Sequence, residues 1–356
     1  MTLLRINNEP RDYAWGSATL IPDLLGTEST GEPQAEIWFG THLGSPAKTE
    51  DGKSLADQIE PLGFLVKFLA AEKPLSIQAH PTREHAAMRF SESHPGYSDS
   101  NHKPELIAAV TRFRALCGFR PISQTAELLA KLSQLESAFE PWQTAFASGG
   151  YRAATKWSLS QDGKSAELLA ATATQLPEIA DLIASIHEYF PADRGLMMAL
   201  MMNYVELAPG EALYLPAGNI HAYLSGLGVE VMAASDNVLR GGLTPKPIDI
   251  PELIEILDFS ELENPKANQK ILLSGLTEYQ TSCDDFEVYR CEPSSNNLLV
   301  DLRLKGRGVL VCTAGEIAIS TSQEETIELK RGQACFFEGA NYYSILGSGT
   351  GYLAMG

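Results

Sequence analysis

The sequence predicts a mainly β protein with a helical insert, and three observations support this fold class. Residues 1–118 carry short apolar runs broken by Gly, Pro and Asn, which is typical of strands and turns. Residues 121–202 instead space Ala and Leu three and four apart with little Gly, which indicates helices. From Tyr204 onward the strand pattern returns, and residues 270–356 show it throughout.

These changes of pattern divide the 356-residue chain into three predicted units. Residues 1–120 together with 203–250 form a first β-barrel, residues 121–202 a helical domain, and residues 251–356 a second β-barrel. Apolar runs mark three expected strands in the first unit: Ile37–Phe39, Phe64–Phe68 and Leu106–Val110. Six are expected in the last unit: Phe286–Arg290, Leu298–Leu304, Gly308–Cys312, Glu316–Ser320, Ala334–Phe337 and Tyr342–Leu346.

Helical periodicity places two helices in the insert and one after it. The first is expected over Thr125–Leu135, with Ser123 or Thr125 as N-cap. The second is expected over Ala166–Tyr189, with Ser165 as N-cap. A short helix over Pro251–Leu257 should precede a linker at Glu263–Asn268, where Pro and Asn interrupt the pattern.

Composition narrows the choice of partners and compartment. The formal net charge is −18 and no Lys/Arg cluster appears, so the sequence gives no support to nucleic acid or a membrane surface as a partner. Neither a signal peptide nor a membrane-spanning run is visible. The five cysteines are scattered without CxxC spacing, which indicates free thiols in the cytoplasm.

A glycine-framed hairpin occurs twice. Gly210–His221 fits the pattern G-x5-P-x-G-x2-H, which resembles the second signature of cupin barrels. Gly332–Tyr343 keeps the frame, but Glu338, Ala340 and Tyr343 replace its Pro, Gly and His. We therefore expect two cupin-like (jelly-roll) barrels, of which only the first holds a metal at this position.

The segment Pro74–Pro81 alternates polar and apolar residues. In a strand, the period of two places Ser76, Gln78 and His80 on one face. Polar residues that face water on a half-exposed strand would explain the same pattern. Pro81 ends the strand and places His80 at a rim.

Two more polar groups complete a candidate metal site. Asn101–Glu105 precedes an apolar strand, and His221 ends the framed hairpin. Considered alone, Asn101–Glu105 is also explained as a solvated turn, and His221 as a structural histidine. Together, Gln78, His80, Glu105 and His221 make a nitrogen and oxygen set suited to Zn²⁺, with Mn²⁺, Co²⁺ or Fe²⁺ as rivals.

The segment 234–246 gathers charge around a flexible Gly pair. It contains Asp236, Arg240 and Lys246. Arg offers a fixed fork of donors for phosphate or enediolate oxygens, and Lys a mobile point charge. In so acidic a chain, this is the local positive site that an anionic substrate needs. A surface loop with ordinary charges is the alternative.

Across essentially its whole length, the sequence resembles the type I mannose-6-phosphate isomerase family. The resemblance rests on six segments in order: Tyr13–Gly16, Ala35–His42, Pro74–Pro81, Asn101–Glu105, Tyr214–Leu224 and Ser235–Lys246. It implies a catalytic cupin barrel, a helical domain, a second barrel, and one zinc ion per chain. The zinc ligands that it implies are Gln78, His80, Glu105 and His221.

The resemblance also implies roles for other residues. Arg240 would lie beside the reacting carbons, and Lys103 and Glu230 would be the acid/base candidates. Ser76 and Lys246 would contact the phosphate of the sugar. The partner is then a small phosphosugar, and we expect a monomer.

An aldose–ketose isomerase must move a proton between neighbouring carbons through a cis-enediol or enediolate. Zn²⁺ and Arg240 suit the charge that develops on oxygen. We favour Glu230 as the carbon base, because a carboxylate is already deprotonated while Lys103 must first lose a proton. The alternatives are an isomerase of free mannose, a non-catalytic sugar-sensing cupin, and an iron-dependent cupin oxygenase, whose ligand set Gln78 fits poorly.

Overall fold

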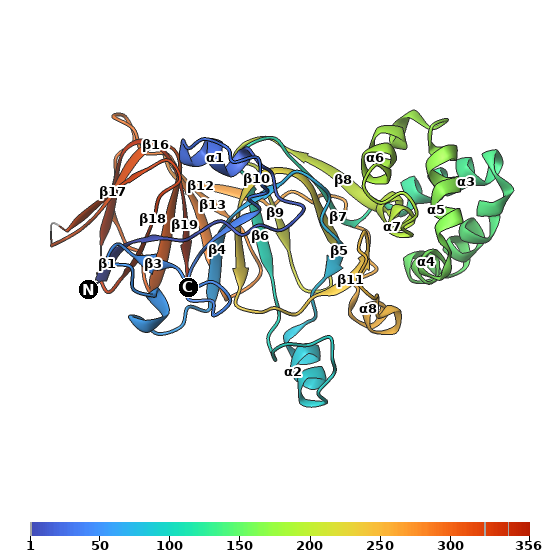
Figure 1. Cartoon of the computed structure of the whole chain (residues 1–356), viewed down its shortest axis with the longest axis horizontal. Coiled ribbons are helices and arrows are strands. Elements are labelled where there is room, and N and C mark those ends of the chain that lie inside the picture. The colour runs from blue at the N-terminus through green and yellow to red at the C-terminus, as the bar shows by residue number, and fades with distance from the viewer. Residues whose placement is uncertain (1, 324, 341) are drawn as a thin grey trace.

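The computed structural model describes residues 2–323, 325–340 and 342–356. Figure 1 shows two β units side by side, with the C-terminal strands at one end and most helices at the other. The protein is mainly β with antiparallel sheets, as the sequence predicts. None of the described helices combines the length and the apolar character that a membrane crossing needs.

The strands form two extended sheets. The N-terminal sheet comprises β2 (Glu36–Phe39), β4 (Phe64–Ala71), β5 (Ile77–Ala79), β6 (Glu105–Ala109), β7 (Phe113–Phe119), β8 (Met202–Leu207), β9 (Ala212–Leu215), β10 (His221–Ala233) and β11 (Leu239–Gly242). The C-terminal sheet comprises β1 (Thr2–Asn7), β3 (Lys48–Thr49), β12 (Gln269–Leu273), β13 (Leu276–Tyr279), β14 (Glu287–Cys291), β15 (Leu299–Leu302), β16 (Arg307–Thr321), β17 (Thr326–Lys330), β18 (Ala334–Glu338) and β19 (Tyr343–Met355).

Strand β10 is the centre of the N-terminal sheet. Its later residues pair with β4 and with β6, and its first residues pair with β5 and β7. All eight residues of β4 are buried, which fits its nearly continuous apolar run. Because β10 touches four other strands, side chains from distant parts of the sequence meet along it.

Two strands at one edge of the C-terminal sheet come from the N-terminal part of the chain. Strand β1 pairs with β18, and β3 pairs with β1. The predicted boundary assigns all of residues 1–120 to the first barrel, so these two strands depart from it. Polar–apolar alternation identifies a strand but not its partner, because pairing depends on contacts far along the chain. Strands predicted separately at Gly308–Cys312 and Glu316–Ser320 are one strand, β16.

Five helices form a block at one end of the molecule (Figure 1). They are α3 (Ile122–Leu135), α4 (Glu140–Ser160), α5 (Gly163–Ala173), α6 (Pro177–His187) and α7 (Gly195–Met201). The single helix predicted over Ala166–Tyr189 is wrong, since the chain breaks before Pro177, which opens α6. Helix α4 contains Gly149 and Gly150 in non-helical conformations, and this interruption breaks the helical spacing that would have predicted it from the sequence.

Both predicted N-caps are also wrong. Helix α3 begins at Ile122, directly after Pro121, and the Thr125 hydroxyl bonds the Tyr151 hydroxyl at 2.7 Å. Helix α5 is capped by Asp162, whose carboxylate accepts from the Ser165 amide at 3.2 Å. Asp and Ser are comparable caps, so spacing alone could not choose between them.

The repeated hairpin occupies matching places in the two sheets. In each copy a Gly with positive φ precedes a short strand, at Gly210 (86°) and Gly332 (85°). The twelfth residue of the frame then opens a thirteen-residue strand, with His221 at the start of β10 and Tyr343 at the start of β19. The Tyr343 phenol oxygen accepts a hydrogen bond from the Ala340 amide at 3.1 Å, where the other copy has an imidazole.

Helices α1 (Leu20–Leu25), α2 (Arg83–Ser91) and α8 (Ile250–Ile256) lie outside the block. Helix α8 confirms the short helix expected after the first barrel. It is tied to α2 by the buried carboxylate of Glu252, which accepts from His85 at 2.6 Å, Tyr97 at 2.7 Å and Arg89 at 2.6 and 3.0 Å. Burial opposes ionisation of Glu252, but these donors outweigh it and lower its pKa to about 2.

Replacing Glu252 by Gln should destabilise the protein at neutral pH by roughly 2 kcal/mol, because charge-assisted hydrogen bonds become neutral ones. A pKa below the ordinary 4.5 means that this stabilisation is complete above pH 4.5 and fades as the pH falls toward 2. Urea unfolding at several pH values measures the difference between the two proteins, which should narrow in acid.

Glu255→Gln is the matched control on the same helix. Its side chain is 61% exposed and its ion pair with Arg152 spans 3.8 Å, so the change should have an effect below about 1 kcal/mol. Equal destabilisation by the two substitutions, or a difference that does not vary with pH, would contradict the role given to Glu252.

Candidate active site

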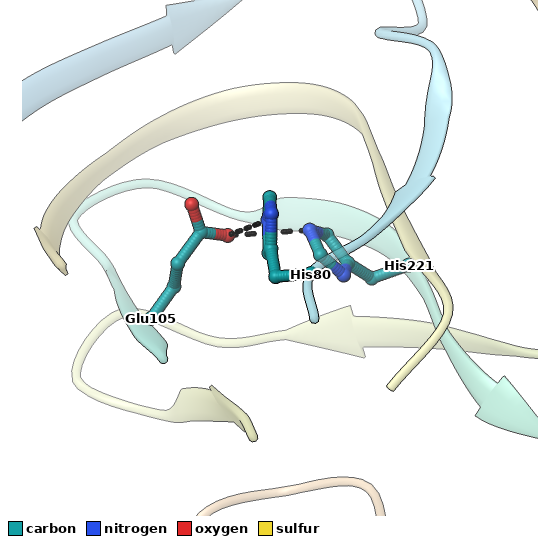
Figure 2. A group of neighbouring side chains, drawn as sticks. All are labelled: His80, Glu105 and His221. Atoms are coloured by element: carbon teal, nitrogen blue, oxygen red, sulfur yellow. Dashed lines mark ion pairs between the residues drawn. The ribbon is translucent and has the colours of Figure 1, made fainter. Parts of the chain in front are cut away.

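Two histidines and a glutamate converge inside the N-terminal sheet (Figure 2). His80 follows β5, Glu105 opens β6 and His221 opens β10. One ligand atom from each lies within 4.8 Å of the others. The Glu105 Oε2 atom is 3.4 Å from His80 Nε2 and 3.2 Å from His221 Nε2, and all three side chains are buried.

Hydrogen bonds on the far side of each ring fix which nitrogen carries the proton. His80 Nδ1 lies 2.7 Å from the Asn237 carbonyl oxygen, and His221 Nδ1 lies 3.1 Å from that of Asn219. A carbonyl can only accept, so each Nδ1 donates, and in the neutral form of each ring Nε2 then carries the lone pair. Burial also lowers the pKa of His80 to about 4, so its ring is neutral at pH 7.

The third atom of the cluster is a carboxylate oxygen. Burial opposes the ionisation of Glu105, but the Lys103 ammonium, 3.1 Å from Glu105 Oε1, outweighs burial and holds the pKa of Glu105 well below its ordinary value. Its Oε2, His80 Nε2 and His221 Nε2 have no hydrogen-bond partner among the described residues. Three buried lone pairs that face one another are the arrangement that a divalent cation satisfies.

Gln78 stands next to this cluster. It is on β5, where it pairs with His221 of β10 on one side and with Arg240 of β11 on the other. The antiparallel ladder therefore brings Gln78, His221 and Arg240 into one row. Gln78 and Arg240 also line the cavity that opens beside the three convergent side chains.

That cavity has a volume of about 640 Å³ and carries charge of both signs. Its cationic lining residues are Lys67, Lys73, Lys103, Arg240 and Lys246, and its acidic ones are Glu36, Glu105, Glu230 and Asp236. Partial burial lowers the pKa of Arg240, yet a guanidinium stays charged at neutral pH. In a chain of net charge −18, this is a local concentration of cations.

The structure brings together every residue that the sequence predicts for the site. Seven line the cavity: Ser76, Gln78, Lys103, Glu105, Glu230, Arg240 and Lys246. The other two, His80 and His221, point their Nε2 atoms at Glu105 from the buried side.

Lys67 is a cavity residue that the sequence analysis missed. Its ammonium lies 2.9 Å from Glu230 Oε2 and 3.6 Å from Glu36 Oε1. Burial opposes its charge, but the two carboxylates outweigh burial and raise the pKa of Lys67. For Glu230 the balance differs: burial raises its pKa, and the Lys67 ammonium, which favours the ionised carboxylate, offsets only part of this effect. A lone cation inside the apolar run Phe64–Phe68 was the signal available in the sequence.

A second group of missed residues lies at the wall beside Lys67. Trp38 Nε1 donates to Glu36 Oε2 at 2.7 Å, and the Lys67 ammonium stands 5.1 Å from the Trp38 ring centre. His42 Nε2 lies 3.2 Å from Asp236 Oδ2, and this hydrogen bond lowers the pKa of Asp236. Strand β2 and the loop after it therefore form part of the cavity.

Comparison with known proteins places this architecture in one group. The profile of the phosphomannose isomerase type I catalytic domain matches residues 49–122. Mannose-6-phosphate isomerase of Salmonella typhimurium is 34% identical, with 98% of each chain covered. The Homo sapiens protein of that name is 33% identical over 93% of this chain and 92% of its own.

Solved structures agree along the whole length. A crystal structure of a variant phosphomannose isomerase from Salmonella typhimurium superposes with a TM-score of 0.91 at 30% identity, covering 100% of this chain and 99% of the other. A crystal structure of mannose 6-phosphate isomerase bound with zinc and yttrium gives a TM-score of 0.89 at 30% identity, with the same coverage.

Purified protein should carry one zinc per chain after dialysis, and His80→Ala should lose it. Removing an inner ligand should weaken zinc binding by more than the roughly 10–100-fold expected for loss of an outer hydrogen-bond partner. Elemental analysis together with chelator competition measures both quantities. His187→Ala, at the end of α6, is the control and should keep its zinc.

Two results would speak against this site. One is a His80→Ala protein that retains stoichiometric zinc. The other is a second equivalent of zinc that survives dialysis, because the matching place in the C-terminal sheet holds Tyr343.

Proposed function

This chain belongs to the type I phosphomannose isomerase family and interconverts mannose 6-phosphate and fructose 6-phosphate, and we propose that it does so in the cavity described above. The observation that carries the site is the set of three buried lone pairs facing one another beside a cation-lined cavity. The full-length similarity carries the reaction.

The proposed metal is one zinc ion. Its proposed ligands are Gln78, His80, Glu105 and His221. Two imidazoles, a carboxylate and an amide oxygen are ligands that zinc accepts, and the hydrogen-bonded Nδ1 atoms leave both rings correctly oriented. When bound, zinc supplies a Lewis acid that stabilises negative charge on a substrate oxygen.

We assign the substrate phosphate to Ser76 and Lys246, which both line the cavity. Lys246 belongs to the turn after β11 and is largely exposed, so it can follow a mobile phosphate. Lys73 lines the same cavity and adds positive charge. A hydroxyl donor and mobile ammonium groups suit a dianion, since each oxygen then has a donor.

Arg240 is proposed to hold the enediolate oxygens. The ladder places it beside Gln78, and its guanidinium forms a fixed fork in a half-buried position. A fixed cation needs no reorganisation when charge appears, which is why such groups favour the transition state over the ground state.

Proton transfer between the two carbons is assigned to Glu230 as base, with Lys103 as the proton donor or acceptor at oxygen. Burial raises the pKa of Glu230, which makes its carboxylate a stronger base than an exposed one. The Lys67 ammonium, at 2.9 Å, supports the ionised form and orients it. Both residues line the cavity, as the assignment requires.

The architecture we propose is a catalytic cupin barrel, a helical domain over residues 121–202 and a second cupin barrel without metal. The two matching hairpins support the pair of barrels. We also propose a cytoplasmic monomer with the phosphosugar as its partner. Five free cysteines fit a reducing compartment.

A coupled assay that compares mannose 6-phosphate with free mannose tests the function. Substitutions of Arg240 and Lys246 in the same assay distinguish stabilisation of the enediolate from binding of the phosphate. Arg240→Ala should lower kcat by about a hundredfold or more, as loss of an oxyanion donor does elsewhere. Lys246→Ala should mainly raise KM for the phosphorylated sugar, because phosphate carries the same charge in substrate and transition state.

Arg303→Ala and Lys305→Ala remove exposed cations from the C-terminal sheet side of the chain and serve as matched controls. Both should turn over normally. If Arg240→Ala changed only KM, the two roles would be interchanged. A wild-type enzyme that preferred free mannose would contradict the assignment of the phosphate site.

A further inference from the structure

We propose that Asn237 is a positioning residue of the metal centre. Its buried side chain would hold in register the carbonyl that orients His80 and the loop that leads to Lys103 and Glu105. This inference rests on the metal site proposed above. Asn237 lies in the loop between β10 and β11 and is fully buried.

The first connection runs through the backbone. The Asn237 carbonyl oxygen accepts from His80 Nδ1 at 2.7 Å, and the Asn237 amide donates to the Ser235 hydroxyl oxygen at 3.2 Å. The position of this carbonyl decides where the His80 ring points. Outer partners of this kind fix both the tautomer and the direction of a metal-binding imidazole.

The second connection runs through the side chain. Asn237 Nδ2 donates to the carbonyls of Asp99 at 2.9 Å and Asn101 at 2.8 Å. Asn237 Oδ1 accepts from the amides of Ser98 at 2.8 Å and Asp99 at 3.3 Å. One amide group therefore closes the loop 98–101, and Glu105 follows it by four residues.

The chemistry of the position calls for an amide. Carbonyls on one side need a donor, and N–H groups on the other side need an acceptor, so only Asn among side chains of this size satisfies both. A buried aspartate would turn a carboxylate toward two carbonyl oxygens and toward the Asp99 carboxylate, 3.2 Å from Nδ2. The loop and the Asn237 carbonyl that orients His80 would then lose their common anchor.

Asn203 offers a matched control. Its Nδ2 donates to three carbonyls, those of Cys117, Phe119 and Leu262, at 3.1, 3.1 and 2.8 Å. None of these partners is a proposed metal ligand. Asn203→Ala therefore removes three side-chain hydrogen bonds to backbone carbonyls, against the five side-chain hydrogen bonds that Asn237→Ala removes, and leaves the orientation of His80 untouched.

The test compares Asn237→Ala, Asn237→Asp and Asn203→Ala with the wild type. Zinc affinity is measured on the full chain by competition with a chromophoric chelator, and unfolding free energy is measured on the metal-free proteins. We expect both Asn237 variants to bind zinc about 10–100-fold more weakly, while Asn203→Ala loses stability but keeps its zinc affinity. The absorption bands of the cobalt(II)-loaded Asn237 variants should also shift, since they report coordination geometry.

Asn237→Ala with wild-type zinc affinity, or Asn203→Ala with an equal loss of affinity, would overturn the proposal. If Asn237→Ala yields no folded protein, Asn237→Asp, which keeps the volume and the acceptor, is judged by the same two outcomes. Failure of the wild type to bind stoichiometric zinc would instead refute the metal site itself, so the two failures are distinct.

Discussion

The convergence of three lone pairs in the N-terminal sheet is the constraint on which the rest of the site depends. His80, Glu105 and His221 are buried side chains, and each turns an acceptor atom toward the same point. Without a cation, such an arrangement is repulsive and would not be retained by packing alone. The long strand β10 makes it feasible, because one strand pairs with the segments that carry the other two residues.

The cavity beside this centre balances its charges in pairs. Lys67 pairs with Glu230 at 2.9 Å and Lys103 with Glu105 at 3.1 Å, and the attraction within each pair offsets part of the free energy that burying the charges costs. Arg240 and Lys246 lack such a neighbour among the ion pairs of the described residues, and they remain free to meet an anionic substrate. In the proposed function, these unneutralised cations are the groups that a strongly acidic chain offers to a phosphorylated sugar.

The sequence was informative where chemistry leaves a local pattern. The alternation through Ser76, Gln78 and His80 and the framed hairpin at His221 predicted side chains that the structure brings together. The sequence did not predict helix α4, because two glycines interrupt its helical period. Nor did it predict that β1 pairs within the C-terminal sheet, because strand partners depend on contacts far along the chain.

Residues that act through others were the hardest to predict. Lys67 lies in an apolar strand and Asn237 in a polar loop, and each makes a hydrogen bond to a group more than 130 residues away in the chain. Only a structure shows that Asn237 lies between two segments that carry proposed metal ligands. Only a structure likewise shows that two carboxylates, those of Glu36 and Glu230, stabilise the charged form of Lys67.

X-ray absorption at the zinc edge of the zinc-loaded enzyme tests the proposed metal ligands most directly. Cys117 pairs with His221 across the ladder, so a sulfur ligand is the nearest competitor, although burial raises the pKa of its thiol to about 12. We expect two imidazole nitrogens together with oxygen ligands at about 2.0–2.1 Å, as in other zinc sites, and no sulfur ligand. A sulfur neighbour, or a single imidazole, would contradict it.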